Sequence, residues 1–172
     1  MPIDALESTR THANLDKLSL RPADSLFHAM TVMKNAAANR VPPGVALVTT
    51  ESGELVGVLT DSDIRNALLY GLSVGDSVDR FMTTDPITLP DTTPMEQVLE
   101  GIRSQLGARG RRNSIRYVVM VDARRRPVSL IDVDSLAHRV SLRWDSAAVI
   151  GLGYVGLTLA VTLAEAGYRV FG

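Results

Sequence analysis

Residues 57–64 read Gly57-Val58-Leu59-Thr60-Asp61-Ser62-Asp63-Ile64, an apolar run followed directly by a polar one. The apolar part predicts the end of a strand, and Asp61 or Ser62 begins a helix that extends to about Tyr70 and stops at Gly71. A helix that starts directly after a strand presents free N–H groups and the positive end of its dipole, and both favour a phosphate. This stretch therefore indicates a candidate anion site.

The chain contains an internal repeat around this stretch. Residues 18–33 align without a gap on residues 87–102, and apolar positions coincide along the alignment. Further on the offset grows by three residues, and residues 45–64 align on residues 117–136. The three extra residues fit a loop around Gly107, where insertions are tolerated. The repeat predicts two similar units.

Each half predicts the order strand–helix–strand–strand–helix. The predicted elements are a strand at 18–20, a helix from Asp24 or Ser25, a hairpin of 45–49 and 55–59, a helix at 62–70, a strand at 87–89, a helix from Thr92 or Thr93, a hairpin of 117–121 and 128–131, and a helix at 133–140. A half of roughly 60 residues buries little core alone, so the two halves should pack together. The predicted fold class is α/β (α+β), with two β-α-β-β-α repeats as a pseudo-twofold pair.

The repeat resembles a tandem pair of CBS (cystathionine-β-synthase) domains. Residues 57–64 carry the resemblance, together with Val78-Asp79-Arg80-Phe81-Met82-Thr83-Thr84-Asp85-Pro86-Ile87-Thr88, which is similar to the usual lead into a second CBS domain. The resemblance covers about residues 15–140. It implies a regulatory module, without catalytic residues, that binds an adenine nucleotide (AMP, ADP or ATP) in clefts between the halves.

The resemblance also implies individual contacts. The hydroxyl of Thr60 can meet a phosphate or ribose oxygen, and the carboxylate of Asp63 can accept both ribose hydroxyls. Spacing alone leaves another reading, in which Thr60 and Asp63 only cap the helix. In the second half Asp132 and Ser135 take these positions. Ser135 lacks the carboxylate that would accept the ribose hydroxyls, and the carboxylate of Asp132 would repel a phosphate. We expect the first site to be the better one and the second to be altered or empty.

Seven arginines fall between residues 109 and 126. The start of a hairpin's first strand lies beside the end of its second. Arg112 and Arg116 are therefore expected at the cleft, with Arg40 placed similarly in the first half, whereas Arg124–Arg126 form a solvated turn. A solvated loop remains the alternative for any single arginine. The full set of predicted nucleotide contacts is Ser19, Arg40, Val45, Thr60, Asp63, Arg112, Arg116, Asp132 and Ser135.

The C-terminal residues carry a different motif. Residues 145–150 predict a buried strand, and Gly151-Leu152-Gly153-Tyr154-Val155-Gly156 matches G-x-G-x-x-G. A helix is predicted at 157–166, Gly167 ends it, and a strand is predicted at 168–171. Strand, glycines, helix and strand are the context of a dinucleotide-binding unit. The charge-free stretch 146–164 is also about long enough to cross a bilayer. The glycine spacing favours the dinucleotide reading.

The residues of this motif resemble the start of the nucleotide-sugar (UDP-glucose/GDP-mannose) dehydrogenases. The resemblance implies that the segment is an incomplete Rossmann βαβ fragment. The resemblance implies NAD contacts, in a full-length parent only, at Gly151, Gly153, Tyr154, Val155 and Gly156. The acidic residue that grips the adenosine ribose is expected about 20 residues beyond the glycines, and the sequence ends before it. The family's cysteine nucleophile is also absent, because the sequence has no cysteine. We expect no catalysis from this chain.

Composition excludes several other classes. A net charge of −1, with 45% apolar residues, gives no global field toward nucleic acid or a membrane. The absence of cysteine excludes disulfide scaffolds and cysteine–zinc sites, and the three histidines lack metal-ligand spacing. With no secretory signal at the N-terminus, the expected location is cytoplasmic.

The sequence thus predicts four segments: an N-terminal extension at 1–14, CBS domains at 15–79 and 80–142, and the Rossmann fragment at 145–172. The preferred function is an adenine-nucleotide sensor that controls a fused or associated sugar-nucleotide enzyme. It is expected to form a homodimer through the CBS helices. Two alternatives stay open, the N-terminal portion of an NAD-dependent nucleotide-sugar dehydrogenase and a structural dimerisation module with empty clefts.

Overall fold

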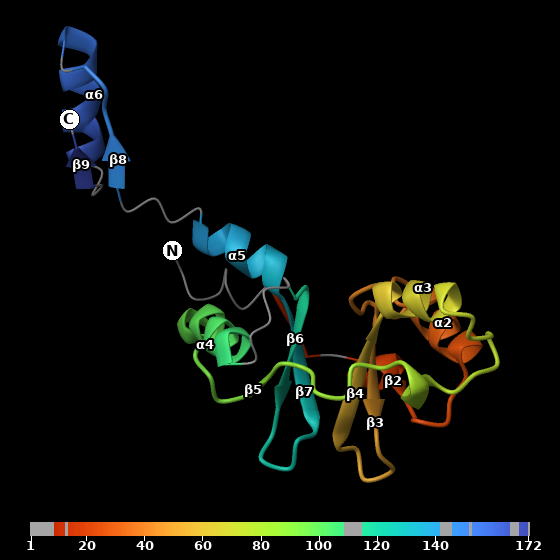
Figure 1. Cartoon of the computed structure of the whole chain (residues 1–172). Helices are drawn as coiled ribbons and strands as arrows, with labels where there is room; N and C mark the ends of the chain where they lie inside the picture. The colour runs from red at the N-terminus through yellow and green to blue at the C-terminus, as the bar shows by residue number, and fades with distance from the viewer. Residues whose placement is uncertain are drawn as a thin grey trace. The chain divides into compact units, whose positions relative to one another are not determined.

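The computed structural model describes residues 9–12, 14–108, 115–141, 146–151, 153–165 and 169–171. The chain divides into two compact units, residues 1–136 and 137–172 (Figure 1). In chain order the elements are β1 (Arg10–Thr11), η1 (Leu15–Leu18), β2 (Ser19–Leu20), α2 (Leu26–Lys34), β3 (Val45–Thr49), β4 (Leu55–Thr60), α3 (Asp61–Leu69), η2 (Val78–Arg80), β5 (Thr88–Pro90), α4 (Met95–Ala108), β6 (Tyr117–Val121), β7 (Pro127–Asp132), α5 (Val133–Ser141), β8 (Ser146–Ala148), α6 (Tyr154–Glu165) and β9 (Arg169–Phe171).

The repeat in the sequence is also a repeat in strand register. In the first half β2 pairs parallel with β3, and β3 pairs antiparallel with β4. In the second half β5, β6 and β7 pair in the same way. Val45 lies opposite Thr60, as Tyr117 lies opposite Asp132, and both hairpins carry a register shift near the end of their first strand. The two halves are therefore one structural unit used twice.

Each half extends the sheet of the other with the segment that leads into it. The N-terminal strand β1 pairs antiparallel with β7 of the second half. In return, Thr83, which precedes β5, forms a bridge with Val58 in β4 of the first half. The two backbone hydrogen bonds of that bridge measure 3.0 and 2.9 Å. The sequence pattern did not predict β1, because a two-residue strand is too short to show a period.

Both halves contribute to one apolar core, as the size of each half predicts. A cluster of buried side chains joins η1, β3 and β4 of the first half to β6 and β7 of the second. Its members are Leu15, Leu18, Ala36, Val41, Val45, Leu47, Leu55, Val119, Val121 and Leu130. A second cluster lies inside the first half, where Leu26, Ala29 and Met33 of α2 pack with residues of β3 and β4.

Helices α2, α3 and α5 begin where the sequence predicts, whereas α4 begins at Met95 rather than directly after Thr93, and α6 begins at Tyr154, before the predicted Leu157. Ser25 caps α2, because its side chain accepts from the backbone N–H of His28 at 3.2 Å. In the second half α4 is longer and contains Gly107, which the alignment places in a loop. Part of the inserted sequence therefore lengthens a helix. A Cβ at Gly107 would meet nothing within 4 Å, so packing does not require a glycine at this position of the helix.

The second unit contains a βαβ arrangement. Strands β8 and β9 pair parallel, with Ser146 opposite Arg169, and α6 lies between them in sequence. The charge-free stretch 146–164 is thus divided between a strand and a 12-residue helix. Within the described residues, no helix is long and apolar enough to cross a membrane.

Candidate functional site

A capping box fixes the start of α3. The Thr60 side chain accepts from the backbone N–H of Asp63, and the Asp63 carboxylate accepts from the backbone N–H of Thr60. The donor–acceptor distances are 3.3 Å and 2.8 Å. Two otherwise unsatisfied donors are thereby satisfied at the point where the strand becomes a helix. The capping role that spacing alone suggests for these residues is present.

Capping leaves part of the Asp63 carboxylate available. Its Oδ2 accepts both Thr60 bonds, from the backbone N–H and, at 2.7 Å, from Thr60 Oγ1. Within the described residues, Oδ1 accepts no hydrogen bond. The side chain is half-buried, and its partners hold it in one orientation. Capping and ligand binding are therefore compatible, because they use different oxygens.

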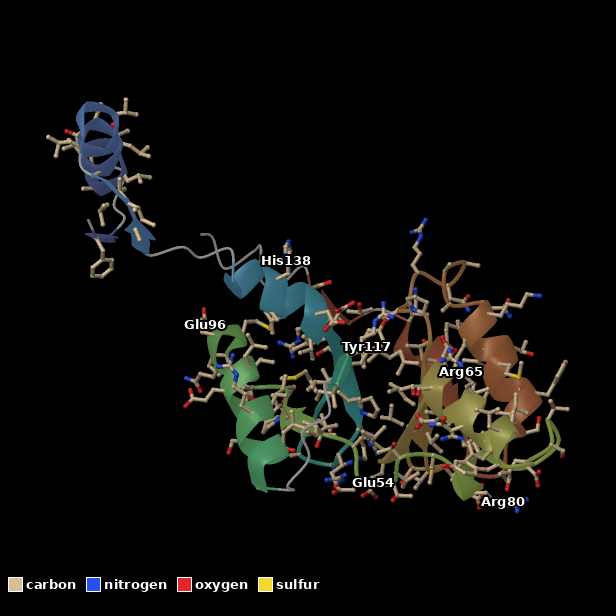
Figure 2. All side chains as sticks on the ribbon, turned by 45° about the horizontal axis from the view of Figure 1, so that its top comes forward. Glu54, Arg65, Arg80, Glu96, Tyr117 and His138 are labelled. Atoms are coloured by element: carbon tan, nitrogen blue, oxygen red, sulfur yellow. The ribbon has the colours of Figure 1, made fainter. Side chains whose placement is uncertain are left out.

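A cavity of about 670 Å³ opens at this helix terminus. Its walls come from the start of α3, the segment that leads into β5, the helix α4 and the start of β6. Arg65 of α3 and Tyr117 of β6, both labelled in Figure 2, line it. The lining residues are Gly44, Val58, Thr60, Asp61, Ser62, Asp63, Arg65, Thr83, Pro86, Ile87, Leu106, Ile115, Arg116, Tyr117 and Val119. Both halves thus build the cavity, and its size lies in the range of small-molecule sites.

The charges at the cavity are balanced. Its lining includes the two carboxylates of Asp61 and Asp63 and the two guanidinium groups of Arg65 and Arg116. Neither arginine forms an ion pair within the residues that the structure describes, and both are exposed. Their guanidinium groups are therefore available to an anionic ligand. Among the described residues, no group of three or more histidine, aspartate or glutamate side chains is placed to hold a metal ion.

The loop at Pro43 and Gly44 is held from both halves. The Tyr117 hydroxyl donates to the Pro43 carbonyl at 3.0 Å, and the backbone N–H of Asp61 donates to the Gly44 carbonyl at 3.2 Å. Gly44 has a φ of 72°, a left-handed conformation that glycine adopts without steric cost. Burial raises the pKa of the Tyr117 hydroxyl, and nearby carboxylates raise it further against the opposing effect of Arg116. The hydroxyl is therefore a protonated donor at neutral pH.

The sequence-predicted contacts divide into three groups. Thr60, Asp63 and Arg116 line the cavity. Arg112 lies outside the described residues. The others, Ser19, Arg40, Val45, Asp132 and Ser135, are not among its lining residues.

Local structure explains most of that third group. Val45 is completely buried in the shared core, and the Ser19 hydroxyl donates to the Leu15 carbonyl at 3.2 Å. Asp132 caps α5, because its Oδ1 accepts from the backbone N–H of Ser135 at 3.0 Å. Arg40 is exposed in the loop before β3. Asp132 and Ser135 therefore repeat the capping role of Thr60 and Asp63 without the acid at the later position.

Five polar residues that line the cavity were not among the predicted contacts: Asp61, Ser62, Arg65, Thr83 and Tyr117. Two of them, Arg65 and Tyr117, supply a cation and a hydrogen-bonding ring. Arg65 follows Asp63 by two positions in the first turns of α3, and Tyr117 follows the predicted Arg116. The sequence predicts that Arg65 lies in the first turns of this helix, close to Asp63, and this position could have indicated that Arg65 lines the cavity. No sequence signal marks Tyr117 as cavity-lining, because the first residue of an apolar strand is more often a core residue.

The glycines of the C-terminal motif have distinct surroundings. Gly151 has a φ of 89°, and Gly153 has open space where a side chain would stand. A Cβ on Gly156 would overlap the carbonyl oxygen of Gly151. Helix α6 begins at Tyr154, and Val155 in its first turn is exposed. A tight turn, an open approach and a close helix contact are the three uses of glycine in a dinucleotide-binding turn.

Comparison with known proteins agrees with the repeat. The family model described as CBS domain matches residues 14–70 and 74–142. An uncharacterised protein of Helicobacter pylori strain J99 is 32% identical over 93 residues, which are 54% of this chain and 26% of that protein. The chain thus spans about a quarter of the length of this relative.

Solved structures share the fold. The CBS domain pair of protein MJ0100, in complex with 5′-methylthioadenosine and S-adenosyl-L-methionine, has a TM-score of 0.58 at 18% identity and covers 79% of this chain and 98% of its own. The CBS domain protein PAE2072 from Pyrobaculum aerophilum, complexed with AMP, has a TM-score of 0.55 at 22% identity and covers 73% and 91%. With two family matches over most of the first unit and its register repeat, this chain belongs to the CBS domain family.

Proposed function

We propose that the first unit is a non-catalytic regulatory module that binds one adenine nucleotide in the cavity beside α3. The single observation that carries the proposal is the Asp63 carboxylate, which is fixed by its capping bonds yet keeps Oδ1 available at the cavity. A solved CBS domain protein of the same fold is complexed with AMP, and a solved CBS domain pair is complexed with 5′-methylthioadenosine and S-adenosyl-L-methionine. Those ligands share an adenosine group, which supports an adenine nucleotide as the ligand class.

The lining suits the parts of such a ligand. Ile87, Leu106 and Val119 supply an apolar wall on which a purine can pack. Asp63 Oδ1 accepts a ribose hydroxyl, a charge-assisted bond that is stronger than a neutral one. Arg65 and Arg116 supply cations for the phosphate, and the N-terminus of α3 adds to the positive potential there.

The second half is proposed to be the altered or empty site. Asp132 and Ser135 stand where Thr60 and Asp63 stand in the first half, as the matched hairpin registers indicate. Ser135 lacks a carboxylate for the ribose. Asp132 adds a negative charge close to where a phosphate would lie. One nucleotide per chain is therefore expected.

Calorimetric titration with AMP, ADP and ATP tests this proposal. Asp63→Asn leaves Thr60 as the N-cap of α3 and keeps a side-chain oxygen that can accept from the Thr60 N–H, but it removes the charge. The affinity should therefore fall by roughly 10- to 100-fold, as expected for a charged hydrogen bond. Asp16→Asn is the matched control, because Asp16 is exposed and contacts Lys17 rather than the cavity; its affinity should stay within about twofold of the wild type. Absence of binding to the unmodified chain would overturn the proposal.

A second function is favoured by the geometry of the other unit. We propose that residues 145–172 are the opening βαβ of a dinucleotide-binding domain of the nucleotide-sugar dehydrogenase type, which the first unit regulates in a longer parent. The parallel pairing of β8 with β9 and the three glycine environments support it. NAD would bind at the Gly151–Gly156 turn in that parent. We expect no NADH from this chain with NAD and UDP-glucose, and NADH formation in an absorbance assay would make the chain itself an enzyme.

We further propose that the protein forms a homodimer through helices of its first half. Its CBS domains are proposed to span residues 15–79 and 80–142, and its proposed location is the cytoplasm. The exposed apolar residues of this half gather on α2, α3 and the loop after them. They are Phe27, Met30, Leu68, Leu69, Tyr70 and Val74. Phe27 and Val74 are joined by a backbone hydrogen bond of 2.8 Å, so α2 and this loop are neighbours. A monomer at high concentration in light scattering would contradict the dimer.

A further inference from the structure

Tyr117 engages two different partners at the cavity. The guanidinium carbon of Arg116 lies 5.2 Å from the centre of its ring, and its hydroxyl donates to the Pro43 carbonyl at 3.0 Å. The first contact holds a cation against an aromatic face. The second crosses from the second half to the first. One half-buried side chain therefore connects a cavity cation to the opposite half of the site.

The first half shows that strand formation does not need this pair. Gly44 and Val45 precede and begin β3, as Arg116 and Tyr117 precede and begin β6. Val45 pairs with Thr60 in the same register in which Tyr117 pairs with Asp132. A valine is therefore sufficient at this position of the sheet. The aromatic ring and hydroxyl of Tyr117 are therefore not needed for the strand, and their contacts are with Arg116, which lines the cavity, and with Pro43.

We propose that Tyr117 is a positioning residue for phosphate recognition, because its ring holds Arg116 at the cavity and the Pro43 hydrogen bond holds the ring. This inference rests on the proposed nucleotide site. A long, exposed arginine loses conformational freedom when it binds an anion, and an arginine already resting on a ring loses less. The ring thus lowers the entropic cost of engaging the phosphate.

The surrounding charges fit this role. Arg116, Asp61, Asp132 and Asp134 are the charged groups that act on the Tyr117 hydroxyl. The carboxylates favour its protonated form, so it remains a hydrogen-bond donor to Pro43. Arg116 itself forms no ion pair within the described part of the chain. Its charge is therefore available to a ligand rather than neutralised by a neighbour.

The test compares AMP with adenosine, which lacks the phosphate, by calorimetry on the full chain. Tyr117→Val installs the residue found at the matching place in the first half, and it should weaken AMP by about tenfold while leaving adenosine within about twofold, in line with a cation–π contact. Tyr117→Phe keeps the ring and should retain AMP affinity within about threefold. Rescue by phenylalanine separates the ring's effect from that of the hydroxyl.

Arg116→Ala completes the test, because Arg116 is exposed and its removal spares the core. In the Arg116→Ala background, Tyr117→Val should cause no further loss of AMP affinity, since the ring acts through the arginine. Equal weakening of AMP and adenosine by Tyr117→Val, or additive losses in the double variant, would overturn the inference while leaving the nucleotide site standing. An unmodified chain that binds neither compound would instead overturn the proposed function, and this inference with it.

Discussion

The two CBS halves share a backbone but differ in chemistry at the same places. Both hairpins use one register, yet Thr60 and Asp63 in the first half correspond to Asp132 and Ser135 in the second. Each pair caps a helix, although Thr60 and Asp63 form a reciprocal capping box whereas Asp132 accepts one bond from the Ser135 N–H. Only the first pair places a fixed carboxylate at the later position. Under the proposed function, capping is kept in both halves while only the first half can bind a ribose.

A second difference concerns what covers the sheet. Gly57 of β4 lies beneath Met82 and Thr83, whereas Ser129 takes its place in β7. Ser129 is completely buried, and its hydroxyl accepts from Arg10 Nε at 2.6 Å. The first half thus uses close backbone contact, and the second half uses a buried polar bond. At each of these matched positions, the residue of one half can be substituted by the residue of the other half, so each difference can be tested separately.

The largest effect is expected when the first site is given the chemistry of the second. The double variant Thr60→Asp/Asp63→Ser retains a good cap, since aspartate caps α5 in the native second half. It removes the ribose acid and adds a charge that repels phosphate. AMP affinity measured by calorimetry should fall roughly 100-fold or more, with little change in the melting temperature. Unchanged affinity would show that these residues only cap.

Gly57→Ser tests the difference in sheet covering. A Cβ at Gly57 would lie 2.5 Å from Met82 Sδ and 3.2 Å from the Thr83 carbonyl oxygen. The overpacking should cost about 1–3 kcal/mol of the free energy of unfolding in urea. Ser129→Ala, the counterpart, loses one hydrogen bond and should cost about 1 kcal/mol. A Gly57→Ser protein as stable as the wild type would contradict the close contact.

Gly44→Ala tests the loop that faces the cavity from the first half. The left-handed backbone and the nearby Asp61 carboxylate both oppose a side chain, so a loss of about 1–2 kcal/mol is expected in thermal or urea unfolding. Gly107→Ala serves as the control. Gly107 is helical with open space around it, and alanine there should stabilise by about 0.5–1 kcal/mol. If both substitutions stabilised the protein, the left-handed backbone conformation of Gly44 would be contradicted.

The smallest effect is expected from pH. The folded-state pKa of Tyr117 lies above its ordinary value of 10.0, because burial opposes ionisation. The neutral hydroxyl therefore contributes stability that is complete below pH 10 and is lost as the pH rises through the folded pKa. Ultraviolet titration of the native protein should show a late step, in which a tyrosine ionises above the ordinary pKa of 10.0, and Tyr117→Phe should abolish that late step. A late step that persists in the variant would assign it to another tyrosine.

The sequence predicted the fold better than the site. Apolar spacing around residues 45–64 and 117–136 was sufficient to predict both hairpins and the helices after them. The short strand β1 was missed, because its pairing with β7 depends on contacts far away in sequence. Among site residues, Thr60 and Asp63 follow from a local motif. Tyr117 could not be predicted, because its role depends on Pro43 in the other half.

The most direct test of the account is the number of AMP molecules that bind the unmodified chain in a calorimetric titration. One AMP per chain is expected, because only the first half holds a fixed carboxylate at the proposed ribose position. Asp63→Asn should weaken that one binding event, while Ser135→Ala should leave it unchanged. Two equivalent sites per chain, or none, would contradict the claim that the halves share a fold but not a binding function.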